Sequence, residues 1–275
     1  MEEKISSILG LNTEFGVGRQ TKTSEFQPEL EKLFAFNNRT INQPVDLNQL
    51  YTEISIGTSV DFDEEIYAII PYGQEIDHTF IIYQNTAKIV DLGTDIIVDQ
   101  FLYYYWKVGF IEYKKTVEDF LSLKVNSIPL SCEDFSLIPF SISTNPKRAI
   151  WVNPGRMNDL RFPFGQRTIV SLVNNFVFYL DRKAKAIYEK MHRAFLVHGI
   201  IKRYAGKMPD GWRMGLLEYL DVSSSYVIRK AINGLTFLEI PGYGKDFYGK
   251  CIEIHDKMIQ GNEKQQILSE LEISE

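Results

Sequence analysis

Clustered carboxylates are the residues of this chain that could most directly support catalysis. The stretch DFDEE at 61–65 places Asp61, Asp63 and Glu64 close together. Carboxylate oxygens are hard ligands that suit divalent cations, as in nucleases that use two metal ions. A solvated acidic loop is the simpler interpretation of so short a run, and a metal-dependent nuclease is therefore our third hypothesis.

The histidines and glycines add no support for an enzyme. The four histidines match no metal-ligand motif, and His192 and His198, six residues apart, would lie on different faces of a helix. The chain contains no HExxH, GxSxG or Walker sequence, and we interpret its GxG stretches at 15–20 and 241–246 as turns. We predict that the protein is not an enzyme and uses no metal or cofactor.

Cations gather in the middle of the chain, although its formal net charge is −6. Residues 147–213 contain fourteen Lys and Arg against four Asp and Glu, a net of +10 that leaves −16 for the remainder. Such segregation can give an acidic molecule one basic face, which is typical of proteins that bind nucleic acid. The alternative is that solvated helices and turns happen to collect lysine here.

The cations that could bind DNA fall into three groups. One group belongs to NPKRAIWVNPGRM (145–157) and the residues that follow, where Trp151 is interpreted as a core aromatic rather than a base-stacking residue. A second lies on a predicted amphipathic helix, and a third on a predicted helix near residue 230. The candidate DNA-binding residues are Lys147, Arg148, Arg156, Arg161 and Arg167, then Arg182, Lys183, Lys185, Lys190 and Arg193, and finally Arg229 and Lys230.

Several β-rich runs must position these cations. IYAIIPYG, HTFIIYQN and AKIVDLG are rich in β-branched and aromatic residues and are bounded by turn residues, so they predict a three-stranded meander. PLSCEDFSLIPFS and AIWVNP predict further strands, and Val98, Phe101, Leu102 and Tyr105 recur at the spacing of a short helix. A helix is also predicted at Pro28 to Phe36.

The clearest local signal lies between Thr168 and His198. TIVSLVNNFVFYL predicts a hairpin turning at Asn174-Asn175, because asparagine tolerates the positive φ of a tight turn. After Asp181, a suitable N-cap, apolar residues recur every three or four positions and cations occupy the other side: Ala184, Ile187, Tyr188, Met191 and Phe195 against Arg182, Lys183, Lys185, Lys190 and Arg193. A solvated helix face is the alternative interpretation of these cations.

The C-terminal part is predicted to be mainly helical. LLEYLDVSSSYVIRKAINGL (216–235) resembles a helix-turn-helix, with a turn at Asp221-Val222-Ser223 and a second helix capped by Ser223 or Ser224. Leu217 and Asp221 replace the small residue and the glycine usual in that motif, so a helical hairpin that docks on the domain is the alternative. GNEKQQILSELEISE at the end predicts a short surface helix.

The remaining features concern location and cysteines. The N-terminal stretch has neither a basic start nor a continuous apolar run, and the sequence holds no 18-residue apolar segment, so we expect a cytoplasmic protein. Cys132 and Cys251 stand alone, 119 residues apart, and we expect two buried, reduced thiols.

From about Glu65 to Ala205 the order of features resembles the ComK family of competence transcription factors. SLIPFSISTNPKRAIWVNPGRM looks like a family segment with matching prolines and tryptophan, and TIVSLVNNFVFYL with AIYEKMHRAFLV is similar to its hairpin and following helix. Asn175 departs from a common glycine, and Glu189-Lys190 from a common Asn-Gln pair. The residues of matching type are Pro139, Ser143, Pro146, Trp151, Asn174 and Arg193.

The resemblance implies a DNA-binding transcription activator that recognises paired A/T-rich boxes through the minor groove, with RNA polymerase and a protease adaptor as partners and a homo-oligomer on DNA. On physical grounds, loop arginines such as Arg148 and Arg156 suit narrow A-tract grooves, whereas helix lysines contact phosphate. The second hypothesis is a regulatory protein-interaction paralogue that has lost DNA binding.

The expected fold is α+β, with an antiparallel β-rich domain that contains the hairpin and its amphipathic helix, followed by the helical extension. The expected divisions are an N-terminal extension at 1–60, a ComK-like domain at 61–205 and a C-terminal extension at 206–275.

Overall fold

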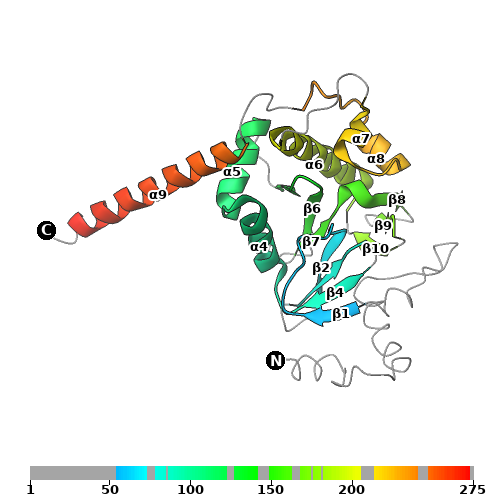
Figure 1. The fold of residues 1–275 in the computed structure, drawn as a ribbon, viewed down its shortest axis with the longest axis horizontal. Helices are drawn as coiled ribbons and strands as arrows, with labels where there is room; N and C mark the ends of the chain where they lie inside the picture. Colours follow the sequence, from blue (N-terminus) through cyan, green and yellow to red (C-terminus); the bar gives the residue numbers. More distant parts are fainter. Residues whose placement is uncertain are drawn as a thin grey trace.

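The computed structural model describes most of the chain beyond residue 53. The described residues are 54–72, 78–84, 86–122, 127–141, 149–162, 168–174, 176–180, 182–205, 214–240 and 247–272. The predicted helix at Pro28 to Phe36 lies outside them. Within them the fold is α+β, as predicted, with a seven-stranded sheet, a three-stranded sheet and helices around both (Figure 1).

The seven-stranded sheet is built around the predicted meander. β2 (Ala68–Tyr72), β3 (His78–Ile82) and β4 (Ala87–Val90) pair antiparallel in chain order, which confirms that prediction. β7 (Ala149–Val152) joins β2, β6 (Ser136–Ser141) joins β7, and β5 (Leu130–Ser131) completes that side. The sheet is not wholly antiparallel, because β1 (Ile54–Gly57) lies parallel to β4 at the other edge.

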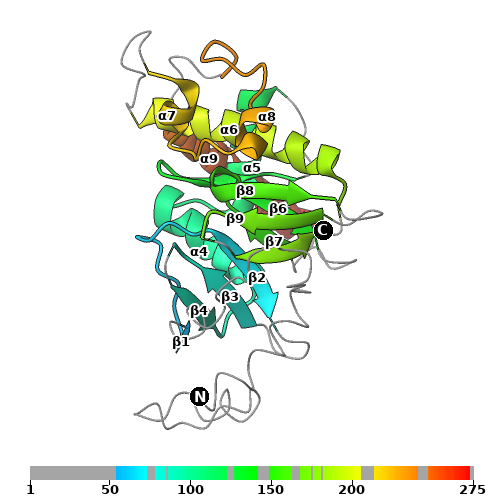
Figure 2. The same ribbon diagram turned by 90° about the vertical axis from the view of Figure 1, so that its right-hand side faces the viewer.

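Both faces of this sheet are covered, which explains why β3 is buried at all five positions. α4 (Thr94–Trp106) and α5 (Phe110–Leu121) lie on one side, and the three-stranded sheet lies on the other (Figures 1 and 2). Trp151 is 6% exposed within the core, which confirms its interpretation as a core aromatic.

Two helices stand where one short helix was predicted. The helical spacing of Val98, Phe101 and Leu102 is confirmed, since all three are buried on α4. α4 ends at Lys107, which adopts the left-handed conformation with φ 55°, and Gly109 then caps α5. A residue with positive φ ends a helix, so the chain turns here instead of continuing.

The second sheet contains the predicted hairpin. β9 (Thr168–Leu172) pairs antiparallel with β10 (Val177–Leu180), and β8 (Met157–Arg161) pairs with the other edge of β9. Asn174 does not adopt the predicted positive φ, and Asn175 lies outside the described residues. Instead the Asn174 side chain accepts from the Phe176 N–H and donates to the Tyr83 carbonyl, so it both forms the turn and ties it to the first sheet.

The predicted amphipathic helix is α6 (Ala184–Tyr204). Ile187, Met191 and Phe195 are buried as expected. The helix begins later than predicted, because Lys183 occupies the N-cap position and no side chain caps it there; Asp181 lies outside the described residues.

The C-terminal part is helical and packs on the same core. α7 (Leu216–Leu220) and α8 (Tyr226–Ala231) lie beside α6, and α9 (Phe247–Glu272) starts against α5 and extends away from the body (Figure 1). The predicted short terminal helix is therefore the end of a 26-residue helix. Within the described part of the chain, no helix is both long and apolar enough to cross a membrane.

Candidate nucleic-acid interface

α6 presents cations on the side opposite its buried stripe. The side chains of Lys185 and Arg193 are exposed, as is that of the N-cap residue Lys183. Lys185, Glu189 and Arg193 fall at steps of four residues, so they follow one face of the helix, with the exposed acid between two cations. Arg182 is half-buried and engaged in an interaction, and it contributes less free charge to this face.

α8 places two more cations beside α6. Val227, Ile228 and Ala231 are buried, and this packing leaves Tyr226, Arg229 and Lys230 on the outer side. The Lys230 ammonium lies 4.8 Å from the centroid of the Tyr188 ring on α6, a cation–π contact that joins the two helices. His192 on α6 also contacts the Ala231 carbonyl through Nδ1 at 3.1 Å.

We call Lys183, Lys185, Arg193, Arg229 and Lys230 the α6–α8 cationic surface. Five of the twelve candidate residues are thus exposed on two adjacent helices. Arg161 is also exposed, on β8 against which α8 packs, but its Nε is 2.6 Å from Asp159 Oδ2, so its charge is largely compensated. Lys147, Arg148 and Arg167 lie outside the described residues.

Arg156 is not presented to solvent, which corrects its predicted role in DNA binding. Its Nε donates to both oxygens of Glu65, at 2.7 and 2.9 Å, and its Nη2 lies 3.9 Å from Asp221 Oδ2. The Arg156 side chain is 17% exposed. Burial raises the pKa of Glu65, while the Arg156 charge and hydrogen bonds act to lower it. Arg156 forms a half-buried ion pair, so we no longer assign it to the loop arginines that would enter the DNA minor groove.

Lys190 is also a structural residue, against the prediction that it contacts phosphate. Its Nζ donates to the Ser127 hydroxyl and to the Pro139 carbonyl at 2.6 Å, and it lies 5.3 Å from the centroid of the Phe140 ring. Burial, with repulsion from Arg182 and Arg193, lowers its pKa to about 8. The ammonium therefore points toward β6 and fastens α6 to the sheet.

The helix-turn-helix candidate docks on the domain through its turn. Asp221 takes the left-handed conformation, φ 52°, that the usual glycine would supply. The Ser223 N–H donates to the Gly155 carbonyl, and a Cβ on Gly155 would lie 2.8 Å from Val222 Cγ1, so the turn sits tightly on the segment before β8. With helices of five and six residues, the docking interpretation fits better than a DNA-reading unit.

The predicted cap of the second helix is wrong by one or two residues. Ser225, rather than Ser223 or Ser224, is the N-cap of α8, and its hydroxyl accepts from the Ile228 N–H. The same hydroxyl donates to the Met157 carbonyl at 2.8 Å. The Met157 carbonyl on β8 explains why Ser225 is the N-cap among three consecutive serines. No local sequence pattern indicates this contact.

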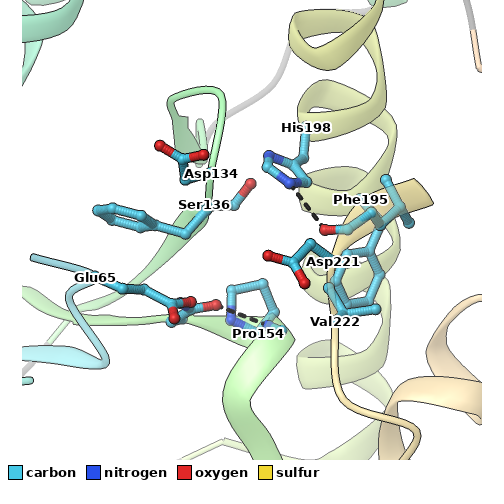
Figure 3. Close-up of a pocket in the computed structure, with 12 residues that line it drawn as sticks. Glu65, Asp134, Ser136, Pro154, Phe195, His198, Asp221 and Val222 are labelled. Atoms are coloured by element: carbon cyan, nitrogen blue, oxygen red, sulfur yellow. Dashed lines mark hydrogen bonds between the residues drawn. The ribbon is translucent and has the colours of Figure 1, made fainter. Parts of the chain in front are cut away.

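A small cavity lies where this turn meets the sheet (Figure 3). The labelled side chains of Glu65, Asp134, His198 and Asp221 line it, but its volume is about 10 Å³, room for about one water molecule. His198 Nε2 lies 3.1 Å from the Leu220 carbonyl, and burial lowers the pKa of this imidazole to about 3. The cavity is too small for an organic ligand.

The acidic loop that suggested a nuclease is tied down by hydrogen bonds. Asp63 Oδ1 accepts from the Tyr104 hydroxyl at 2.6 Å, and Asp61 Oδ1 accepts from the Asp63 N–H. Among the described residues, no group of three or more His, Cys, Asp or Glu side chains is arranged to hold a metal ion.

Sequence reasoning missed two residues, one exposed on the α6–α8 cationic surface and one that removes a candidate residue from the interface. Tyr226 is 76% exposed on α8, and its spacing from Arg229 and Lys230 could have revealed a shared face. Glu65 neutralises Arg156 from 91 residues away, and no local signal reports such a partner.

The comparisons with known proteins leave the assignment open. No protein-family model, characterised protein or solved structure matches the chain. The likeness to ComK therefore rests on the residues given above.

Proposed function

We propose that the protein binds double-stranded DNA through the α6–α8 cationic surface and acts as a transcription activator of the ComK type. The observation that carries the proposal is that five exposed cations lie on two packed helices, and three of them (Lys183, Lys185 and Arg193) belong to the 147–213 segment of net charge +10. Cations fixed on helices suit phosphate contacts, which hold a protein on the duplex without reading its sequence.

Preference for A/T-rich sequence is a separate part of the proposal. With Arg156 held by Glu65, Arg148 remains as the loop arginine assigned to the minor groove, where A-tracts attract arginine. RNA polymerase, a protease adaptor, a homo-oligomer on DNA and a cytoplasmic location follow from the same resemblance and stay predictions.

A gel-shift titration with A-tract and G·C duplexes at two salt concentrations tests the proposal. The logarithm of the binding constant should fall with the logarithm of salt concentration by about 0.9 for each phosphate contact. The double variant Lys185→Gln, Arg193→Gln should weaken both duplexes by similar factors and reduce that slope by about 2. Arg148→Ala should instead weaken the A-tract selectively.

Lys257→Gln is the matched control, because Lys257 is an exposed lysine on α9, which extends on the opposite side of the molecule from α8 (Figure 1). It should leave both affinities within about twofold. Equal losses from Lys257→Gln and from the α6 variant would mean that general charge, rather than this surface, drives binding.

The second candidate function is a regulatory protein-interaction module. Two observations favour it: the groove-facing arginine expected at 156 is used by the fold, and the chain outside 147–213 carries −16. Absence of duplex binding, or binding that does not change with salt, would support this candidate over the first.

A further inference from the structure

The outer face of α8 combines one aromatic side chain with two cations. Tyr226, Arg229 and Lys230 stand at positions i, i+3 and i+4, so their Cβ atoms are neighbours at roughly 5–6 Å on one helix face. Tyr226 is 76% exposed. Among the described residues, its ring forms neither an aromatic pair nor a cation–π contact, and most of the side chain is accessible to solvent.

The neighbouring side chains fix where the charges lie. The Lys230 ammonium lies over the Tyr188 ring of α6. The Arg229 Nε donates to the carbonyl of Ser224, two residues before Tyr226, at 3.1 Å. Both cations therefore have defined positions around α8. Burial raises the pKa of Tyr188, with smaller contributions from Tyr226 and Asp159.

The surroundings of Tyr226 argue against an apolar docking site. The apolar residues of α8, Val227, Ile228 and Ala231, are all buried, so no aliphatic side chain of this helix accompanies the exposed ring. An exposed aromatic ring with two cations on the same helix face matches a ligand that offers flat aromatic faces along a polyanion. Single-stranded nucleic acid has these two properties, whereas the base faces of a duplex are covered by stacking.

We infer that the α6–α8 cationic surface binds single-stranded nucleic acid, with Tyr226 stacking on an unpaired base while Lys185, Arg229 and Lys230 neutralise nearby phosphates. This inference rests on the proposed function, since it uses the same cations, and it adds unpaired bases to the ligands of that surface. Because the same cations are proposed to bind DNA, the strand would be one strand of locally opened DNA.

The test measures fluorescence anisotropy with labelled oligothymidylate and oligouridylate of about 16 nucleotides and with an A/T-rich duplex. Tyr226→Ala should weaken single-strand binding about tenfold, because base–aromatic stacking is lost. Tyr226→Phe keeps the ring and should stay within about twofold of the unmodified protein. Duplex affinity should change by less than about twofold in both variants.

Tyr103→Ala is the matched control, because Tyr103 on α4 is an exposed tyrosine (67%) with a cation, Lys107, close by on the chain. It should leave single-strand binding unchanged. Circular dichroism of each variant checks that α8 and the rest of the fold are retained. Binding of oligothymidylate at least as tight as that of oligouridylate supports a DNA strand, and clear preference for oligouridylate would overturn that choice of ligand.

The outcomes separate this inference from the proposed function. Unchanged single-strand affinity in Tyr226→Ala, with duplex binding still sensitive to Lys185→Gln, Arg193→Gln, overturns the inference alone. Single-strand binding that depends on Tyr226, without duplex binding, overturns the proposed function alone. Equal losses for single strand and duplex in Tyr226→Ala also contradict stacking on an unpaired base.

Discussion

The Arg156 guanidinium lies between two carboxylates, and its removal would leave Glu65 half-buried without a counter-charge. We expect Arg156→Ala to lower the free energy of unfolding by about 2–3 kcal/mol at pH 7, as for hydrogen bonds to partly buried charged groups. Urea denaturation measures this change. Arg161→Ala is the control, because its ion pair with Asp159 is exposed and should contribute less than about 0.5 kcal/mol.

The pH dependence of the free energy of unfolding of Arg156→Ala tests whether the unpaired Glu65 causes the loss of stability. The folded-state pKa of Glu65 is raised by burial, and without Arg156 it would rise further, so ionised Glu65 destabilises the fold as pH increases through that range. The stability difference between Arg156→Ala and the unmodified protein should therefore be larger at pH 7 than near pH 4, where Glu65 is protonated. A difference that does not depend on pH would assign the loss to packing instead of charge.

The pKa shift of Lys190 changes stability with pH in the opposite direction to that of Glu65. Its pKa falls from 10.5 to about 8 in the folded protein, so the unfolded chain binds more protons between these values and stability contributed by this group rises with pH. Urea denaturation at pH 8 and 10 should show a gain for the unmodified protein relative to Lys190→Met. Duplex affinity should stay within about twofold in that variant, because the ammonium faces Pro139 rather than solvent. Lys190→Met that lowers affinity as much as Lys185→Met would restore Lys190 to the interface.

For single residues, the sequence identified the cations, but it could not show which side chains are exposed to solvent and which are paired within the fold. Local spacing identified Lys185 and Arg193 as exposed, since the buried stripe of α6 determines its other side. It could not identify the partners of Arg156 and Lys190, because Glu65 and Pro139 reach them from 91 and 51 residues away.

Among the elements, α8 depends on one hydroxyl. Ser225→Ala removes both the cap of the Ile228 N–H and the hydrogen bond to the Met157 carbonyl, so it should lower the free energy of unfolding by about 1–2 kcal/mol. Thermal denaturation followed by circular dichroism measures the loss. Ser224→Ala, one residue earlier and exposed, should change stability by less than about 0.5 kcal/mol. The reverse order would restore Ser224 as the cap.

Strong periodicity made most elements predictable from the sequence. The meander, the hairpin and α6 each have a long, consistent pattern, and all three are confirmed. β1 has four residues and pairs in parallel with β4, whose residues lie 33 positions later in the chain, and no short sequence pattern predicts this pairing. The break between α4 and α5 depends on a positive φ at Lys107, a residue that rarely signals one.

For the whole molecule, the two cysteines report whether the C-terminal helices fold with the sheet. Cys132 and Cys251 are buried and neither forms a disulfide, as predicted, and burial raises the pKa of the Cys132 thiol to about 11. Because the thiolate is the reactive form, both should be inert to a thiol reagent at pH 8 in the native protein. We expect both to become reactive in a single transition as urea increases. Reaction of Cys251 at lower urea would show that α9 opens separately.

The predicted domain boundary at residue 205 marks the end of the ComK-like stretch. The hydrophobic core continues across this boundary. Tyr219, Leu220 and Phe247 belong to the same hydrophobic cluster as the sheet residues. Composition alone could not show this, because short helices with mixed surfaces look alike whether they dock or stand apart. Whether 61–205 folds alone stays a prediction.

The Glu65–Arg156–Asp221 contact also has a kinetic consequence. It joins segments far apart in the chain, and long-range contacts close late because their loop entropy must be overcome first. An interaction absent from the folding transition state affects mainly the rate of unfolding. Arg156→Ala should therefore shorten the lifetime of the native state, seen in stopped-flow unfolding, while refolding proceeds at nearly the original rate. This ion pair would then act as a latch that determines how long the folded molecule lasts.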